Sequence, residues 1–253
     1  MNYHNAPKNL LQSISVTILF ILILLILPFI LELPFFNLSQ FQKQLTVALI
    51  GGISIILIMI YFFNYRLKVT SYHSFQLYLF IALLAVSINL LIDTPLLFLS
   101  SGAELYGNLG SKLNPYHFLT FFLISPLVEE IFFRDFIFRR LLISKNFLYA
   151  LLVSTILFSI GHLTLYRIPS AIILALITGT IYYLYKDVLM CILFHSFSNL
   201  TNELVLYFNQ LNSLTIKGLN DLYGEYNKIT FIIAATLTLL ILFLLKQNRY
   251  KIK

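Results

Sequence analysis

Two adjacent carboxylates and an arginine lie within an otherwise apolar stretch of the chain. Glu129 and Glu130 are followed by Arg134, and Phe, Leu and Ile residues flank all three. Glu130 and Arg134 are four residues apart and can form an ion pair on a helix, whereas Glu129 points about 100° away from Glu130. A carboxylate beside an ion-paired carboxylate in a low-dielectric environment is suited to act as a general base. We therefore predict a structural role for Glu130 with Arg134 and a chemical role for Glu129.

Two further apolar stretches carry polar groups that could act with Glu129. His162 follows Phe158 at a spacing of four, and His195 precedes Asn199 at the same spacing. One helix face would thus present the imidazole of His195 and the amide of Asn199. A face of another helix would present the phenyl ring of Phe158 and the imidazole of His162. A charged or polar side chain inside a membrane costs free energy and needs a partner or a function. Packing histidines, or an interfacial helix whose charges reach water, remain the structural alternatives at this point.

The composition favours lipid as the solvent of the whole chain. Of the 253 residues 59% are hydrophobic and 11% are charged, well beyond an ordinary soluble domain. The net charge of +7 comes from Lys and Arg in short polar segments, which indicates contact with anionic lipid headgroups and excludes a nucleic-acid-binding face. The single Cys191 is expected to be a buried small apolar residue. We expect one membrane domain over residues 1–253.

Eight apolar windows are long enough to be membrane helices, each of which needs about 20 residues. They fall at 10–31, 45–63, 75–99, 117–142, 147–166, 169–185, 188–207 and 229–246. The fold class expected is therefore all-α, a polytopic helical bundle. With the N-terminus inside, eleven Lys and Arg residues lie on the cytoplasmic side and five on the other, which predicts that both termini are cytoplasmic.

The depth of each group can be estimated by counting residues from the predicted cytoplasmic helix ends. At about 1.5 Å per residue, Glu129 lies ~20 Å deep, His162 ~22 Å, His195 ~10 Å and Asn199 ~16 Å. These depths allow the side chains to meet, although His195 is shallow. The small residues of the window 169–185 predict tight packing against a helix that carries the site: Ala171, Ala175 and Gly179. Asn89 is expected to cap a helix or to be solvated at its end.

Taken in order, these motifs resemble those of the CAAX-protease and bacteriocin-processing family of intramembrane proteases, also called CPBP or Abi. The likeness covers residues 117–207 and rests on three patterns in successive apolar stretches: Glu129-Glu130-x-x-x-Arg134, Phe158-x-x-x-His162 and His195-x-x-x-Asn199. It implies that Glu129 is the principal catalytic carboxylate and that His162 helps it to handle water. It also implies transition-state or ligand roles for His195 and Asn199.

The resemblance leaves two chemical mechanisms open. Glu129, His162 and His195 are similar to a His₂Glu zinc set with an open position for water. In the metal-free alternative Glu129 deprotonates water with help from His162, and His195 and Asn199 steady the oxyanion. The sequence has no local HExxH spacing, and we favour the metal-free mechanism slightly.

The function expected is that of an intramembrane endopeptidase acting on a membrane-associated protein or peptide precursor. The family precedents are CAAX proteins and bacteriocin, pheromone or leader peptides, and the Asn-, Ile- and Lys-rich composition suggests a bacterial cytoplasmic membrane. A scaffold or bacteriocin self-immunity protein that works without catalysis is the main alternative. An ion transporter would predict repeated halves with interrupted helices, and no second copy of the glutamate pair or of either histidine motif is present.

Overall fold

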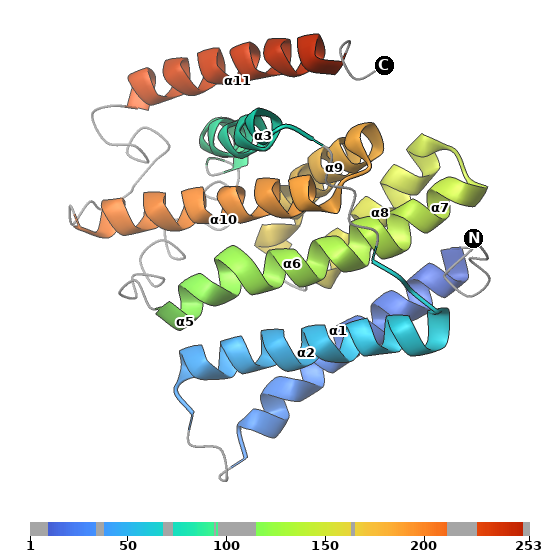
Figure 1. Ribbon diagram of the computed structural model, residues 1–253. Helices are drawn as coiled ribbons and strands as arrows, with labels where there is room; N and C mark the ends of the chain where they lie inside the picture. Colours follow the sequence, from blue (N-terminus) through green and yellow to red (C-terminus); the bar gives the residue numbers. More distant parts are fainter. Residues whose placement is uncertain are drawn as a thin grey trace.

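The computed structural model describes residues 10–33, 38–67, 73–93, 95, 115–162, 165–211 and 227–249, and all regular structure in these residues is helical. The helices lie side by side as an elongated bundle (Figure 1). Their bounds are α1 Leu10–Leu31, α2 Gln40–Phe63, α3 Phe75–Ile88 with η1 Asn89–Asp93, α5 Pro115–Phe118, η2 Leu119–Ile124, α6 Ser125–Glu130, η3 Ile131–Phe138, α7 Arg139–Ser144, α8 Phe147–Gly161, η4 Leu165–Arg167, α9 Ile168–Tyr185, α10 Val188–Leu211 and α11 Asn227–Arg249.

The predicted all-helical membrane fold is confirmed. Each of the eight apolar windows contains helix, and six helices in the described residues are long and apolar enough to cross a membrane. The fifth window is shorter than expected, because α8 ends at Gly161 and not at residue 166. The third window is helical to Asp93, and most of its remainder lies outside the described residues.

Polar residues at the predicted breaks cap the helices. The Asn146 side chain accepts a hydrogen bond from the Tyr149 amide at the start of α8. Asp187 Oδ1 accepts from the Leu189 amide at the start of α10. Asn64 ends α2 in the left-handed region with φ of 48°, which asparagine tolerates better than most residues. These caps satisfy backbone groups that the helix itself leaves unpaired.

Helix α1 begins, and α11 ends, at the same end of the bundle (Figure 1). This arrangement agrees with an even number of crossings. The side of the membrane on which that end lies stays a prediction from the charge distribution.

The fourth apolar window forms one continuous rod from α5 to α7 that contains two widened π-helical segments, η2 and η3. Pro126 explains the first widening, because proline has no amide hydrogen and its ring displaces the preceding turn. The Ser125 amide accordingly bonds to Thr120 O, one residue further back than in an α-helix. In the second segment the Arg139 amide bonds to Arg134 O. Such widened turns are frequent at functional sites.

Helix α9 packs against α8 through its small residues, as the sequence predicted. Ala171, Ala175 and Gly179 are all buried. A Cβ at Gly179 would lie 2.5 Å from Leu151 Cδ1 on α8, so a larger residue here would force Leu151 to move. Since α8 ends next to His162, the close packing fixes the helix that carries that histidine.

A buried carboxylate near the α7 end of the rod ties three helices together. Asp135 is fully buried and accepts hydrogen bonds from Tyr65 Oη at 2.5 Å and Tyr182 Oη at 2.7 Å. Arg139 Nη1 lies 3.1 Å from Asp135 Oδ1. These partners compensate the carboxylate for its loss of water. Asp135 therefore serves the architecture of α2, η3 and α9.

Candidate active site

Glu130 lies at the centre of a buried polar network. Its side chain is fully buried, and Oε1 lies 3.0 Å from His195 Nδ1 while Oε2 lies 3.0 Å from Arg134 Nε. The predicted ion pair with Arg134 is therefore confirmed. The second contact joins α6 to α10 across the bundle and was not predicted. Glu130 thus holds an imidazole as well as balancing a guanidinium.

Arg134 is fully buried and contacts residues of α6, α8 and α9. Its Nε donates to Thr178 Oγ1 at 2.8 Å, and its Nη1 donates to Ser154 Oγ at 3.4 Å. Since the Nε hydrogen goes to Thr178, the contact with Glu130 Oε2 is an attraction between charges and not an aligned hydrogen bond. The guanidinium also lies 4.8 Å from the centre of the Phe158 ring, a cation–π contact. The sequence did not indicate Thr178 and Ser154 as supporting residues, and it did not predict the contact of Phe158 with Arg134.

The hydrogen-bond partners of the two histidines assign their tautomers. His162 Nδ1 lies 3.1 Å from Phe158 O, and a carbonyl oxygen only accepts, so Nδ1 carries the hydrogen. His195 Nδ1 faces the Glu130 carboxylate at 3.0 Å and donates for the same reason. The Nε2 atom of each ring is then the nitrogen available for chemistry.

The Phe158 ring separates and positions the two imidazoles. Its centroid lies 4.8 Å from that of His162 and 6.0 Å from that of His195. Phe158 is fully buried and is packed from its other side by Phe133 at 5.1 Å. The shared helix face predicted for Phe158 and His162 is therefore present.

Glu129 lies beside this network without joining it. Its side chain is half-buried, and among the described residues no hydrogen bond or ion pair engages its carboxylate. The charges of Glu129 and His195 both act on the His162 imidazole, which places the three groups in one neighbourhood. A carboxylate that stands in this position without a structural partner is free to bind a water molecule or a substrate.

Arg167 adds a cation to the same neighbourhood. Its charge acts on His162 as well, and its guanidinium lies 5.9 Å from the centre of the Phe121 ring. The sequence placed Arg167 in a loop and gave no signal of its proximity to the site.

Asn199 lies one helical turn from His195 and uses one amide hydrogen to hold α10 against η2. Asn199 Nδ2 donates to Phe121 O at 2.8 Å. The carbonyl is available for this bond because the Ser125 amide bonds to Thr120 O and Pro126 has no amide hydrogen. The amide therefore keeps one hydrogen and its oxygen for other partners.

Asn89 supports α10 from the opposite side and corrects a prediction. It is fully buried, and its Nδ2 donates to Ser198 O at 3.0 Å. Of the roles expected for Asn89, solvation at a helix end is therefore wrong, whereas Asn89 does stand at the end of α3. Its bond holds the turn of α10 between His195 and Asn199.

The candidate zinc ligands do not form a ligand cluster as the structure places them. Within the described ranges no three His, Cys, Asp or Glu side chains are close enough to hold one metal ion. The types of donor in Glu129, His162 and His195 suit zinc, and each histidine has the second hydrogen bond that orients a metal ligand. Because the present geometry does not unite the three donors, we derive no catalytic step through a metal.

The backbone of α2 approaches the site at Gly52. A Cβ at this position would lie 2.4 Å from Cγ2 of Val128, the residue before Glu129. We expect Gly52→Ala to lower the free energy of unfolding by about 1–3 kcal/mol through overpacking, and a second change, Val128→Ala, to recover part of the loss. Thermal unfolding in detergent measures both effects.

Gly161→Ala is the matched control, because the nearest atom to its added Cβ is Phe133 Cζ at 3.8 Å. A glycine in a membrane helix often allows close approach of another backbone, but among the described residues only the Phe133 side chain lies near the added Cβ. Equal stability of Gly52→Ala and the parent would contradict the close contact of α2 with α6.

Comparison with known proteins agrees with the motifs. Residues 111–201 match the model of a family described as type II CAAX prenyl endopeptidase Rce1-like. This segment contains every residue predicted for the site: Glu129, Glu130, Arg134, His162, His195 and Asn199. The match covers residues 111–201 of the 253-residue chain and is consistent with the CAAX-protease and bacteriocin-processing family. No curated protein and no solved structure gives a match.

Proposed function

We propose that the protein is an intramembrane endopeptidase in which Glu129 activates the water that attacks a peptide bond. The observation that carries the proposal is the different environment of two adjacent carboxylates. Glu130 is fully buried between His195 and Arg134, whereas Glu129 is half-buried and unbonded within the described chain next to His162. A pair of titratable groups in different environments is the usual arrangement for separate chemical roles.

The hydrogen-bond directions support specific roles for the other residues. The charge of Glu129 acts on the His162 imidazole, and in the proposed mechanism His162 Nε2 shares the proton taken from water. His195 protonated on both nitrogens would donate its Nε2 hydrogen to the oxyanion, and Glu130 would stabilise the imidazolium. The second amide hydrogen of Asn199 is the other donor that we assign to the oxyanion.

The proposed substrate is a membrane-associated protein or peptide precursor. The CAAX-type family match and the location of the site between membrane helices support this class.

Purified protein in detergent or vesicles tests the proposal directly. We expect cleavage of a fluorogenic prenylated CAAX peptide or of a leader-peptide precursor, with activity retained after chelation and dialysis. Metal analysis of the same preparation accompanies the assay. If chelation abolishes cleavage and added zinc restores it, the metal-free mechanism is contradicted but the proposed peptidase activity is not. Absence of cleavage with every class of precursor would contradict the proposed peptidase activity.

A further inference from the structure

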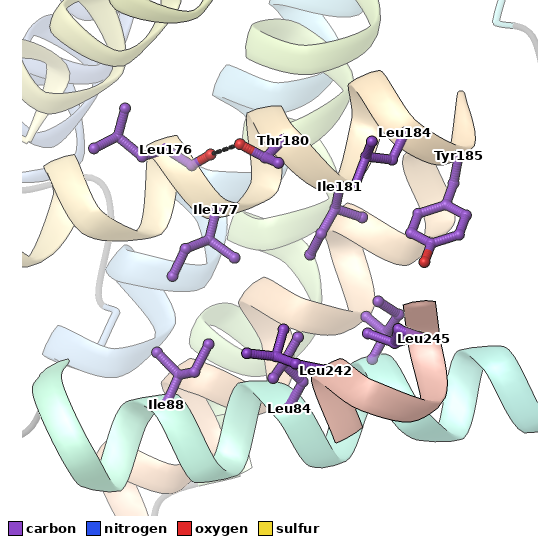
Figure 2. Close-up of a pocket in the computed structure, with 11 residues that line it drawn as sticks. Leu84, Ile88, Leu176, Ile177, Thr180, Ile181, Leu184, Tyr185, Leu242 and Leu245 are labelled. Atoms are coloured by element: carbon purple, nitrogen blue, oxygen red, sulfur yellow. Dashed lines mark hydrogen bonds between the residues drawn. The ribbon is translucent and has the colours of Figure 1, made fainter. Parts of the chain in front are cut away.

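An apolar groove of about 450 Å³ lies between α9 on one side and α3 and α11 on the other. Figure 2 shows the side chains of these helices facing one another across it. Helices α3 and α9 both pack against α10, and α11 packs against α3. The groove is therefore formed by elements from three separated parts of the chain. Its volume is in the range of ~300–1,000 Å³ that is usual for sites of small ligands.

The lining of the groove suits a hydrocarbon and not a polar ligand. Leucine and isoleucine make up most of it, and none of the lining residues that the structure describes is charged. The Thr180 hydroxyl donates to Leu176 O at 2.7 Å, so its hydrogen is used within α9 (Figure 2). An apolar space of this size that stayed empty would forfeit the dispersion contacts of its walls. In a bilayer the available hydrocarbon is the lipid acyl chain.

The length and one end of the groove fit a lipid of a single leaflet. Along α9 the lining runs from Leu176 to Tyr185, or ~14 Å at 1.5 Å per residue. This is about half of the ~30 Å hydrocarbon core. At the Tyr185 end the apolar helix stops, and the polar residues Lys186 and Asp187 follow.

Aromatic side chains and one lysine lie at the level of that end, with Lys186 and Tyr183 on the side of α9 that faces Phe147 of α8. His73 Nε2 donates to Tyr185 O at 3.2 Å, and Tyr78 Oη donates to Asp187 Oδ2 at 2.5 Å. Lys186 Nζ lies 4.3 Å from the centre of the Tyr183 ring. Tyrosine and lysine at a helix end are typical of the headgroup level of a membrane. The groove thus leads from the headgroup level to the middle of the bilayer.

The groove and the candidate active site lie on different faces of α9. Thr178 faces Arg134, whereas its neighbours Ile177 and Ile181 line the groove. None of the candidate catalytic side chains lines the groove.

We propose that this groove is a binding site for one acyl chain of a membrane phospholipid, with the headgroup at the Tyr185–Lys186 end. The site holds the lipid more tightly than the outer surface of the bundle does, because protein walls contact the chain from both α9 and α3. The proposal is independent of the proposed peptidase activity.

The absence of tryptophan from the sequence allows a direct test. Leu242→Trp places a single indole at the groove, and Leu239→Trp places one on the same helix at a position that is 69% exposed. The variants are purified in detergent and titrated with a phosphatidylglycerol whose acyl chains are brominated, which quench indole fluorescence on contact. We expect saturable quenching of Leu242→Trp near one lipid per protein, at a concentration at least tenfold below that needed for Leu239→Trp.

Two further measurements separate the possible occupants. Adding Ile177→Phe to Leu242→Trp fills the groove and should abolish the tight quenching, and unbrominated phospholipid should reverse it. Leu245→Trp replaces Leu242→Trp if the latter fails to fold. Equal titrations at the groove and the outer surface, or no quenching at the groove, would overturn the proposal. Reversal by a prenylated peptide but not by phospholipid would also overturn it and assign the groove to a substrate chain.

Discussion

Replacing Glu129 by glutamine is expected to lower the rate of peptide cleavage by about 10²–10⁴-fold while the protein stays folded. Glutamine keeps the size of the side chain but cannot take a proton from water. The loss of folding stability is expected to be small. Glu129 is half-buried, and its carboxylate makes no hydrogen bond or ion pair with the described residues. Cleavage rate and folded yield, measured on the same preparations, test both parts of this expectation.

Glu32→Gln is the control for Glu129→Gln. Glu32 forms an exposed ion pair with Lys43 at 2.9 Å at the end of α1, far in the sequence from the candidate site. We expect this variant to keep both yield and activity, since exposed ion pairs contribute little. Full biological function of Glu129→Gln, together with undetectable cleavage by the parent, would instead favour a scaffold or immunity protein that binds a partner.

Local relations between residues were the ones that the sequence predicted well. The ion pair of Glu130 with Arg134 and the shared face of Phe158 and His162 both follow from a spacing of four on a helix. Helix α9 matches its predicted window to within one residue, because Pro169 and Lys186 bound an uninterrupted apolar run. These features depend on the geometry of one helix alone.

The packing of α9 through its small residues was predicted, but the contacts of individual polar side chains between helices were not, because they depend on the tilt and rotation of each helix. Counting residues placed His195 ~10 Å shallower than Glu129, yet His195 bonds directly to Glu130. The count assumed straight, parallel helices with a common end, and the rod that carries Glu130 contains widened turns. The position of Thr178 had a usable signal, since it lies next to the small residues Ala175 and Gly179 that mark the packed face of α9.

Asn199 shows how a single local irregularity changes the role of a distant residue. The motif suggested a transition-state role, and the structure uses one of its two amide hydrogens to satisfy Phe121 O. That carbonyl needs a partner because of Pro126 and the widened turn before it. The signal in the sequence was Pro126, five residues after Phe121. In a π-helical turn the amide of residue 126 would donate to Phe121 O, and proline has no amide hydrogen.

Replacing Glu130 by glutamine is expected to destabilise the protein as well as to impair cleavage. Glu130 and Arg134 are both fully buried, and removing one charge of a buried pair costs about 3–5 kcal/mol because the other is left uncompensated. Arg134 is already imperfectly satisfied, since its Nη2 has no hydrogen-bond partner. The loss should appear as a lower folded yield and a lower midpoint of thermal unfolding in detergent.

The double variant Glu130→Gln/Arg134→Gln separates the two functions that we assign to Glu130. Removing both charges leaves no buried unpaired cation, so yield and thermal midpoint should recover toward those of the parent. Cleavage should stay low, because a neutral amide at position 130 no longer stabilises a positive charge on His195, whose Nδ1 lies 3.0 Å from the carboxylate in the parent. Recovery of cleavage together with stability would show that Glu130 serves the fold alone. Failure of the double variant to regain stability would instead contradict the charge-compensating role of the Glu130–Arg134 pair.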